Sequence, residues 1–171
     1  MTGEGEGLAA VYATRPLEAR DRSAVAAILE HVGNFSDQEK HVALELIDLW
    51  LKVGEASDYL CWVLQDEAEV RGYVCVGPTP LTNGTFDLYW IAVDPSAQGR
   101  GYGQALTRLA EDEARARGGR LMLIETASQE TYAPTVRFYE RAGYQMVSRI
   151  RDFYKAGDDK LTFAKRLDRV S

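Results

Sequence analysis

The chain has few cysteines, histidines and prolines, and it lacks an excess of positive charge. Its 171 residues include two cysteines, two histidines and five prolines. Acidic residues outnumber basic ones by 26 to 20, which gives a formal net charge of −6 at pH 7. A nucleic-acid-binding surface normally carries an excess of positive charge, so we expect no nucleic-acid partner. Small amines are more natural partners for such a chain.

Long hydrophobic runs are also missing. No apolar stretch approaches the roughly 20 residues that a membrane-spanning helix needs. The first ten residues are rich in glycine and glutamate and lack the basic start and apolar middle of a signal peptide. We therefore expect a cytoplasmic protein without a membrane partner. We also expect a disordered tail at residues 1–10 and a single domain at residues 11–171, because a chain of this length builds one core.

The scarce cysteines and histidines indicate neither a metal site nor thiol catalysis. Cys61 and Cys75 lie in apolar, strand-like runs, which favours buried reduced thiols over a disulfide or a nucleophile. His31 and His41 have no cysteine or carboxylate cluster at the spacing of metal ligands. We expect no bound metal.

A glycine-rich loop, Gln98–Gly103, is the most informative segment that the chain does contain. It follows the strand-like run Thr85–Val93, closed by Asp94 and Pro95, and leads into an amphipathic segment. Glycines allow positive φ and a close approach of the backbone to a ligand, while the first amides of a helix have no internal partner. Strand, loop and helix together predict a binding site for an anion such as a phosphate.

The spacing of this loop fits two common nucleotide-binding motifs badly. A nucleoside-triphosphate loop ends in Gly-Lys-Ser/Thr, whereas Gly103 is followed by Gln104 and Ala105. A dinucleotide loop needs its third glycine where Gln104 stands. The pattern Gln-x-x-Gly-x-Gly, after a strand that ends in Ile91–Pro95, instead resembles the pyrophosphate loop of the GNAT acyltransferase superfamily, which binds acetyl-CoA.

The resemblance to GNAT enzymes extends over nearly the whole chain. Val11–Arg15 and a helix from about Asp21 resemble the first strand and helix of the superfamily, and Leu121–Glu125 resembles the strand after the cofactor helix. The segment Phe138–Tyr144 is similar to the helix end that carries the family's tyrosine. The other expected strands are Tyr59–Gln65, Val70–Gly77, Gln145–Phe153 and Leu161–Leu167.

This resemblance implies an α/β fold of the α+β kind. Its centre would be a mixed, mostly antiparallel twisted sheet of about six to seven strands, flanked by about four helices. In GNAT folds the two parallel middle strands splay apart at their carboxyl ends, and the gap admits the pantetheine arm of CoA. The run Thr85–Val93 alternates as a strand with two distinct faces does, whereas Leu121–Ile124 is wholly apolar, which predicts burial on both faces.

By resemblance, acetyl-CoA is the acetyl donor and binds along the middle strand and the glycine loop. The backbone of Ile91, Ala92 and Val93 would form hydrogen bonds with the pantetheine arm. The residues expected to hold the pyrophosphate are Gln98, Gly99, Arg100, Gly101, Tyr102, Gly103 and Gln104.

Attack of an amine on a thioester needs a neutral amine, an oxyanion donor and an acid for the departing thiolate. A backbone amide near Ala92 or Val93 would polarise the carbonyl, as in the family. Tyr139 is the candidate acid, because a phenol with a pKa near ~10 is roughly matched to a thiolate somewhat above the free-cysteine value of ~8.5.

The candidate base is Glu125, because it ends an otherwise apolar strand where the gap should open. Asp87, Tyr89 and a chain of water molecules remain alternatives for this role. Many family members have a CoA-contacting asparagine seven residues before the helix tyrosine, where this chain has Tyr132, so we expect Tyr132 to reach the acceptor pocket. Asp87 and Tyr89 are further candidates for acceptor contacts.

The sequence thus predicts an N-acetyltransferase that moves an acetyl group from acetyl-CoA to a primary amine by direct attack in a ternary complex. A small-molecule amine is favoured over a protein amino terminus. A non-catalytic acyl-CoA sensor or interaction module on the same fold is the alternative, and it would need neither Tyr139 nor Glu125. The acceptor's identity, the pathway and the choice between monomer and homodimer stay open. The expected acceptor walls are Asn34–Val53, Gly77–Gly84 and Arg151–Lys160.

Overall fold

The computed structural model describes residues 11–168. The expected disordered tail, residues 1–10, and the last three residues, 169–171, lie outside this range. The strands are β1 (Ala13–Pro16), β2 (Leu60–Asp66), β3 (Glu69–Pro78), β4 (Thr85–Val93), β5 (Leu121–Ala127), β6 (Gln145–Lys155) and β7 (Asp158–Arg166). The α-helices are α1 (Arg22–Val32), α2 (Asp37–Val53), α3 (Tyr102–Ala116) and α4 (Ala133–Arg141).

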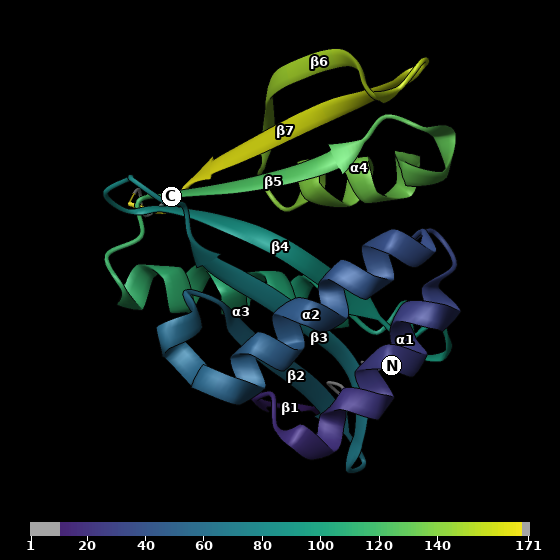
Figure 1. Ribbon diagram of the computed structural model, residues 1–171, viewed down its shortest axis with the longest axis vertical. Coiled ribbons are helices and arrows are strands. Elements are labelled where there is room, and N and C mark those ends of the chain that lie inside the picture. Colours follow the sequence, from purple (N-terminus) through teal and green to yellow (C-terminus); the bar gives the residue numbers. More distant parts are fainter. Residues whose placement is uncertain (1–10, 169–171) are drawn as a thin grey trace, which may run out of the picture.

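All seven strands form one mixed sheet in the order β1-β2-β3-β4-β5-β7-β6. Only β4 and β5 pair in parallel, and every other neighbouring pair is antiparallel. Helices α1 and α2 lie in front of the sheet in Figure 1, whereas α3 lies behind it. The expected mixed, mostly antiparallel sheet with four flanking helices is confirmed.

The two parallel strands separate soon after they meet. Their register contains three pairs, from Thr85 opposite Leu121 to Asp87 opposite Leu123. Beyond them, β4 stays on β3 while β5 stays on β7, as Figure 1 shows. Strand β4 also has a β-bulge at Tyr89, where the register with β3 shifts by one residue. Such a bulge bends the strand and increases its twist. The expected splay of the middle strands is therefore present.

Each face of the sheet has its own core. On one face α3 packs through Leu106, Ala110 and Ala114 against buried strand residues such as Met122 and Ile124. The other face is covered by α1 and α2. Its buried residues are Leu17, Val25, Ile28, Leu29, Ala43, Ile47, Cys61, Val63, Tyr73, Cys75 and Ala92.

The expectation that Leu121–Ile124 is buried on both faces is only half right. Met122 and Ile124 are fully buried beneath α3, whereas Leu121 and Leu123 are half-buried. The cause is the splay, since the α1 and α2 layer follows β2 to β4 and leaves the other face of β5 partly open. An apolar sequence alone does not show that a neighbouring strand has moved away.

The two cysteines lie directly opposite each other on β2 and β3. Cys61 and Cys75 are fully buried free thiols, as the sequence predicts. The neighbouring Cys61 thiol and burial raise the pKa of Cys75 well above its usual value. Within residues 11–168, no helix is long and apolar enough to cross a membrane. The same part of the chain has no cluster of three or more metal-binding side chains.

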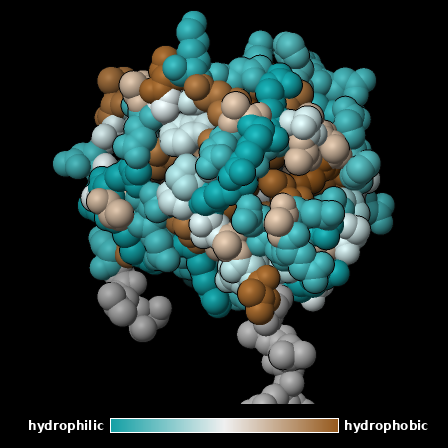
Figure 2. Space-filling model, turned by 90° about the horizontal axis from the view of Figure 1, so that it is seen from below, coloured by the Kyte–Doolittle hydropathy of each residue, from teal (hydrophilic) through white to brown (hydrophobic). Residues whose placement is uncertain are grey.

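Viewed from below, the surface is mainly hydrophilic, with separate hydrophobic spots between polar side chains (Figure 2). Strand β6 is different, because all of its residues are exposed at the edge of the sheet. Its large apolar side chains at the surface are Met146, Val147, Ile150, Phe153 and Tyr154.

Candidate functional site

A cleft of about 1310 Å³ opens where β4 and β5 part. Its floor is the carboxyl half of β4, and its walls come from α4, the start of α3, the α1–α2 segment and the β6–β7 hairpin. Ligand pockets are concave, mostly apolar and supplied with a few polar groups that converge on them. This cleft has that character, and it is much larger than the second cavity, which measures about 240 Å³.

The floor of the cleft presents backbone groups of β4. Ile91, Ala92 and Val93 pair with Val74, Tyr73 and Gly72 of β3 along one edge only. On the other edge the ladder with β5 has already ended at Asp87. A strand edge without a neighbour carries free N–H and C=O groups, which can bind an extended, amide-containing ligand as an added strand would.

The glycine loop lies at the end of this floor. Gly99 and Gly101 have φ values of 80° and 81°, which side chains rarely adopt, and Gly101 is the N-cap of α3. The first bond inside the helix runs from Ala105 N to Gly101 O, so the three preceding helix amides have no intrahelical partner. Free amides and the positive end of a helix dipole are features that favour an anion, so a phosphate site at this loop stays a prediction.

Two side chains of the loop point elsewhere. The Tyr102 hydroxyl donates to Asp66 Oδ2 at 2.5 Å, and Arg100 Nη1 donates to the same oxygen at 3.1 Å. Tyr102 is buried, and Arg100 is the one predicted donor-binding residue that does not line the cleft. Asp66 thus engages the Tyr102 hydroxyl and one N–H group of Arg100. The sequence could not show this, because Asp66 belongs to a different hairpin.

Tyr139 lies on α4 and lines the cleft from the α3 side of the sheet. The side chain is 4% exposed, and burial raises the pKa of its phenol well above the usual value. Unlike the hydroxyls of Tyr132 and Tyr144, the Tyr139 hydroxyl forms no hydrogen bond within residues 11–168. A protonated phenol without a protein partner at a cleft wall is free to donate its proton to a ligand.

Glu125 lines the same cleft from the other face of β5. Met122 and Ile124 belong to the same core cluster as Tyr139, so alternation along the strand turns Glu125 to the opposite face. Glu125 is exposed, and its Oε1 accepts a hydrogen bond from Lys160 Nζ at 3.0 Å. Sequence reasoning missed Lys160 as a partner, although the antiparallel register of β5 and β7 brings the two segments together.

Asp87 and Tyr89 lie on the Glu125 side of the gap, since Phe86 and Leu88 take the opposite face. Thr79 Oγ1 donates to Asp87 Oδ2 at 2.6 Å. Burial raises the pKa of Asp87, and the negative charge of Glu125 raises it further. Burial first, and then the Asp87 charge, raise the pKa of the Tyr89 phenol well above its usual value.

Tyr132 joins two walls of the cleft. Its hydroxyl donates to the Asn34 carbonyl at 2.8 Å, which links the segment before α4 to the loop between α1 and α2. Burial and the nearby Glu39 carboxylate raise the pKa of Tyr132 to about 12. Tyr132 therefore lines the cleft at the point where the segment before α4 meets the α1–α2 loop.

Two of the three expected acceptor walls line the cleft. The α1–α2 segment contributes Asn34 and Glu39, and the last hairpin contributes Tyr154 and Asp158. The loop Gly77–Gly84 does not line it. That expectation is wrong in detail, because the loop acts through Thr79, which holds Asp87 from outside the cleft.

Among residues 11–168, the structure brings together every predicted site residue except the Arg100 side chain. It also adds side chains that carried no readable signal, such as Phe138, which faces Gly103 at 3.4 Å from the position of an added Cβ. Contacts of this kind join elements far apart in the chain, so only the fold reveals them.

With this geometry established, comparison with known proteins decides the family. The model of the Acetyltransferase (GNAT) family matches residues 24–144, which is more than half of the chain. This chain belongs to the GNAT family. The matched segment runs from α1 to Tyr144, so it includes the split strands, the glycine loop and Tyr139.

Individual GNAT proteins agree with this assignment. A GNAT-family structure from Desulfovibrio desulfuricans is 41% identical, with a TM-score of 0.89, and the match covers 92% of this chain and 99% of that one. An acetyltransferase structure from Salmonella typhimurium with its cofactor acetyl-CoA has a TM-score of 0.70 at 20% identity, over 94% and 96% of the two chains, and shows the shared fold.

A curated relative is also similar over part of its length. The mycothiol acetyltransferase of Beutenbergia cavernae is 31% identical over 116 residues, which are 67% of this chain and 38% of that protein. The chain thus spans less than half of this curated relative.

Proposed function

We propose that this protein is an N-acetyltransferase that transfers an acetyl group from acetyl-CoA to a primary amine by direct attack in a ternary complex. The observation that carries the proposal is the cleft of a GNAT-family chain, where a phosphate-binding helix start, a free strand edge, a buried phenol and a carboxylate line one space. Each feature matches one requirement of acyl transfer between a CoA thioester and an amine.

The free edge of β4 and the start of α3 form the proposed binding site for acetyl-CoA. The backbone of Ile91, Ala92 and Val93 binds the pantetheine arm, because an unpaired strand edge offers donors and acceptors in register with its amides. The amides from Gly99 to Gln104 bind the pyrophosphate, supported by the positive end of the helix dipole. No basic side chain of the loop is required, in agreement with the engagement of Arg100 by Asp66.

Glu125 is the proposed general base. It lies where the strands have parted, on the face opposite Tyr139, so it can take a proton from an amine that approaches the thioester from that side. Lys160 holds the carboxylate at the rim. Asp87 is the main rival, because its raised pKa lies closer to that of an effective base at neutral pH.

Tyr139 is the proposed general acid. Its raised pKa keeps the phenol protonated at neutral pH, and its hydroxyl has no competing partner within residues 11–168. It donates its proton to the sulfur of the thiolate as the bond to the acyl carbon breaks. A backbone amide on the free edge of β4, around Ala92 or Val93, stabilises the oxyanion.

The acceptor is proposed to be a small amine that enters beside Glu125. Carboxylates outnumber basic groups on this side of the cleft and attract a cation. They are Glu39, Asp87, Glu125 and Asp158. Tyr132, which ties the α1–α2 loop to the base of α4, limits the space for a bulky acceptor such as a folded protein's amino terminus. A non-catalytic sensor would need none of these groups, and the acetyltransferase family assignment weighs against it.

An acceptor screen tests the proposal. Purified protein is incubated with acetyl-CoA and single members of four amine classes: amino acids, polyamines, amino sugars and short peptides. We expect CoA thiol release that depends on one of the first three classes. Tight acetyl-CoA binding with no transfer to any class would favour the sensor, and no binding at all would refute the donor assignment.

A further inference from the structure

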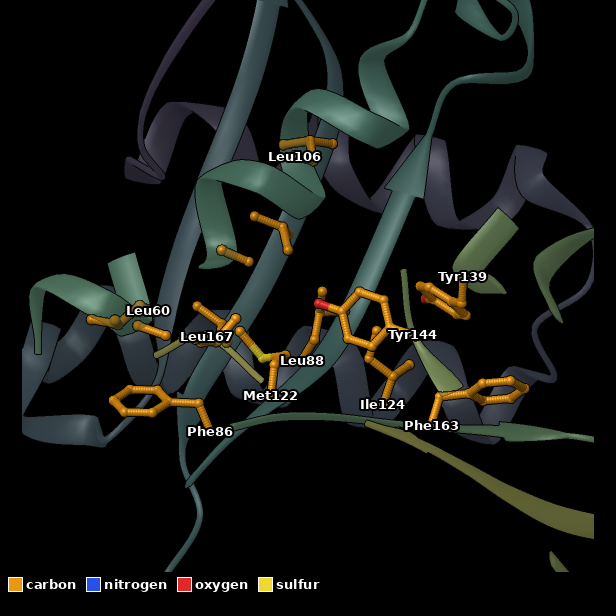
Figure 3. Packing of buried hydrophobic residues seen from close by; sticks show 14 of the residues in the cluster. Leu60, Phe86, Leu88, Leu106, Met122, Ile124, Tyr139, Tyr144, Phe163 and Leu167 are labelled. Atoms are coloured by element: carbon orange, nitrogen blue, oxygen red, sulfur yellow. The ribbon is translucent and has the colours of Figure 1, made fainter. Parts of the chain in front are cut away.

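The position of Tyr139 is not fixed by its own helix. Helix α4 has nine residues, and isolated helices of that length are unstable in water. The hydroxyl has no hydrogen bond to residues 11–168 that could hold it. Packing therefore orients the ring, which lies 6.0 Å from the Tyr144 ring and 6.4 Å from the Phe163 ring between centroids. Figure 3 shows the three rings in the core beside β5.

A buried carboxylate on α3 lies next to this group. Glu111 is 3% exposed, and its Oε1 accepts hydrogen bonds from the Tyr144 hydroxyl at 2.9 Å and from Lys165 Nζ at 2.9 Å. Its Oε2 accepts a second bond from the same ammonium at 3.0 Å. A buried charge is costly unless it is paired and hydrogen-bonded, so these three side chains restrict one another to a single arrangement.

The same groups hold the end of α4. Lys165 Nζ donates to the carbonyl of Ala142, the residue that follows the helix, at 2.9 Å. The Tyr144 amide donates to the Tyr139 carbonyl at 3.0 Å, across a turn in which Gly143 has a φ of 93°. Both hydrogen-bond partners of Glu111 in this cluster, Tyr144 and Lys165, are thus attached to the end of the helix that carries Tyr139.

We propose that Glu111 is a positioning residue for acetyl transfer: through Tyr144 and Lys165 it fixes the last turn of α4 and thereby aims the Tyr139 phenol into the gap. The inference rests on the proposed role of Tyr139 as the acid. Glu111 does not line the cleft and touches neither substrate, so its effect on turnover passes through Tyr139. Displacement of a reacting group by about 1 Å costs on the order of 10²-fold in rate.

The test uses Tyr144→Phe and Glu111→Gln, each alone and combined with Tyr139→Phe. Tyr144→Phe removes one hydroxyl and keeps both the ring and the Glu111–Lys165 pair, so it should fold normally. For either single variant at saturating substrates, we expect kcat to fall on the order of 10-fold, with little change in the KM for acetyl-CoA. This loss is smaller than the 10²-fold cost of a full displacement by about 1 Å. In the Tyr139→Phe background, neither change should lower kcat further. Arg115→Gln is the matched control, since Arg115 approaches Glu111 at 3.7 Å but does not contact α4, and it should keep full kcat.

Hydrogen exchange supplies a readout that does not depend on activity. The amides of residues 133–144 should exchange faster in both variants than in the parent protein, while those of β2 and β3 stay protected. Unchanged exchange in this segment would overturn the proposal, as would full kcat in both folded variants.

The failure of the acid assignment gives a different pattern. If Tyr139→Phe keeps full turnover, the acid role and with it the positioning role are both refuted. If Tyr139→Phe is impaired but the losses from Tyr144→Phe and Glu111→Gln persist at full size in its background, only the positioning role is refuted.

Discussion

At the scale of single residues, the gap between β4 and β5 separates the proposed acid and the proposed base by sheet face. Tyr139 comes from the α3 side, and Glu125 and Asp87 lie on the other side, as strand alternation requires. An amine that loses its proton on one face and a thiolate that gains one on the other can share a single thioester. This division explains how one narrow opening accommodates both steps.

Replacing Tyr139 with phenylalanine should lower kcat and kcat/KM together, by about 10²-fold or more, with little change in acetyl-CoA affinity. The reason is that the hydroxyl acts on the sulfur only as the thiolate departs. An acyl donor with a more acidic thiol should restore part of the rate. Steady-state kinetics with both donors provide the measurement, and an unchanged melting temperature is the control. Full turnover in Tyr139→Phe would show that the ring is only core packing.

The pH profile of the parent protein should lack a descending limb from this phenol. Burial raises the pKa of Tyr139 above the ordinary ~10, so the acid stays protonated as the pH rises from 7 to about 10. The measurement is kcat against pH at saturating substrates, with protein stability checked at each point. A fall in kcat centred near pH 8 that Tyr139→Phe abolishes would contradict the assignment.

Glu125→Gln should reduce turnover most at low pH, by about 10²-fold, and less at high pH where the amine loses its proton unaided. Asp87 gives a contrasting result. The Glu125 charge raises the pKa of Asp87, so its removal lowers that pKa. If Asp87 were the base, activity in Glu125→Gln would persist to lower pH than in the parent. Profiles of kcat/KM for Glu125→Gln and Asp87→Asn distinguish the two bases.

At the scale of elements, much of the strand, loop and helix proposed to bind the donor could be predicted from the sequence. The bounds of Thr85–Val93 agree with β4 because alternation, Asp94-Pro95 and the glycines are all local signals. The side chains of Arg100 and Tyr102 could not be placed, since their partner Asp66 lies on another hairpin. The same limit hid the Glu125–Lys160 pair and the buried Glu111 cluster, which depend on strand register.

Two glycines of the loop differ in what an added side chain would meet. An added Cβ at Gly103 would meet the Phe138 ring at 3.4 Å, so a bulky residue there disturbs the contact between α3 and α4. Gly101 is the better probe, because its Cβ would meet open space while its φ of 81° disfavours any side chain. Gly101→Ala should weaken acetyl-CoA binding, since left-handed strain costs roughly 1–2 kcal/mol. Calorimetric titration is the measurement, with Gly103→Ala as the milder control; equal affinity of Gly101→Ala and parent would contradict a role for this turn.

The bridge from Tyr132 to the Asn34 carbonyl should affect the acceptor alone. Tyr132→Phe removes the hydroxyl that ties the α1–α2 loop to the segment before α4. We expect a several-fold higher KM for the amine. The dissociation constant for acetyl-CoA should not change, because its proposed phosphate site lies at the start of α3. Steady-state kinetics at a fixed, saturating acetyl-CoA concentration measure the amine KM, and calorimetric titration measures the acetyl-CoA dissociation constant. A parallel loss of acetyl-CoA affinity would place Tyr132 in the donor site instead.

At the scale of the whole molecule, the packing of the helices keeps the two halves of the sheet apart beyond the β4–β5 contact. Strands β1 to β4 are held by α1, α2 and α3, while β5 to β7 carry α4, and three residue pairs between β4 and β5 join the two groups at the closed end. The cleft is the space that this arrangement leaves open. The proposed donor half relies on backbone groups of β4 and the start of α3, whereas the proposed acceptor half relies on side chains from several elements, which is why the sequence predicts the donor better than the acceptor.

The most direct test of the account is a mass-spectrometric assay of acetyl transfer in one reaction mixture that contains the protein, acetyl-CoA and an amine acceptor found in the screen. We predict that the acetyl group appears on the amine nitrogen with one free CoA thiol for each amine modified, and that both products are strongly reduced in Tyr139→Phe. Thiol release without acetylated amine, or equal product from parent and Tyr139→Phe, would contradict direct transfer in this cleft.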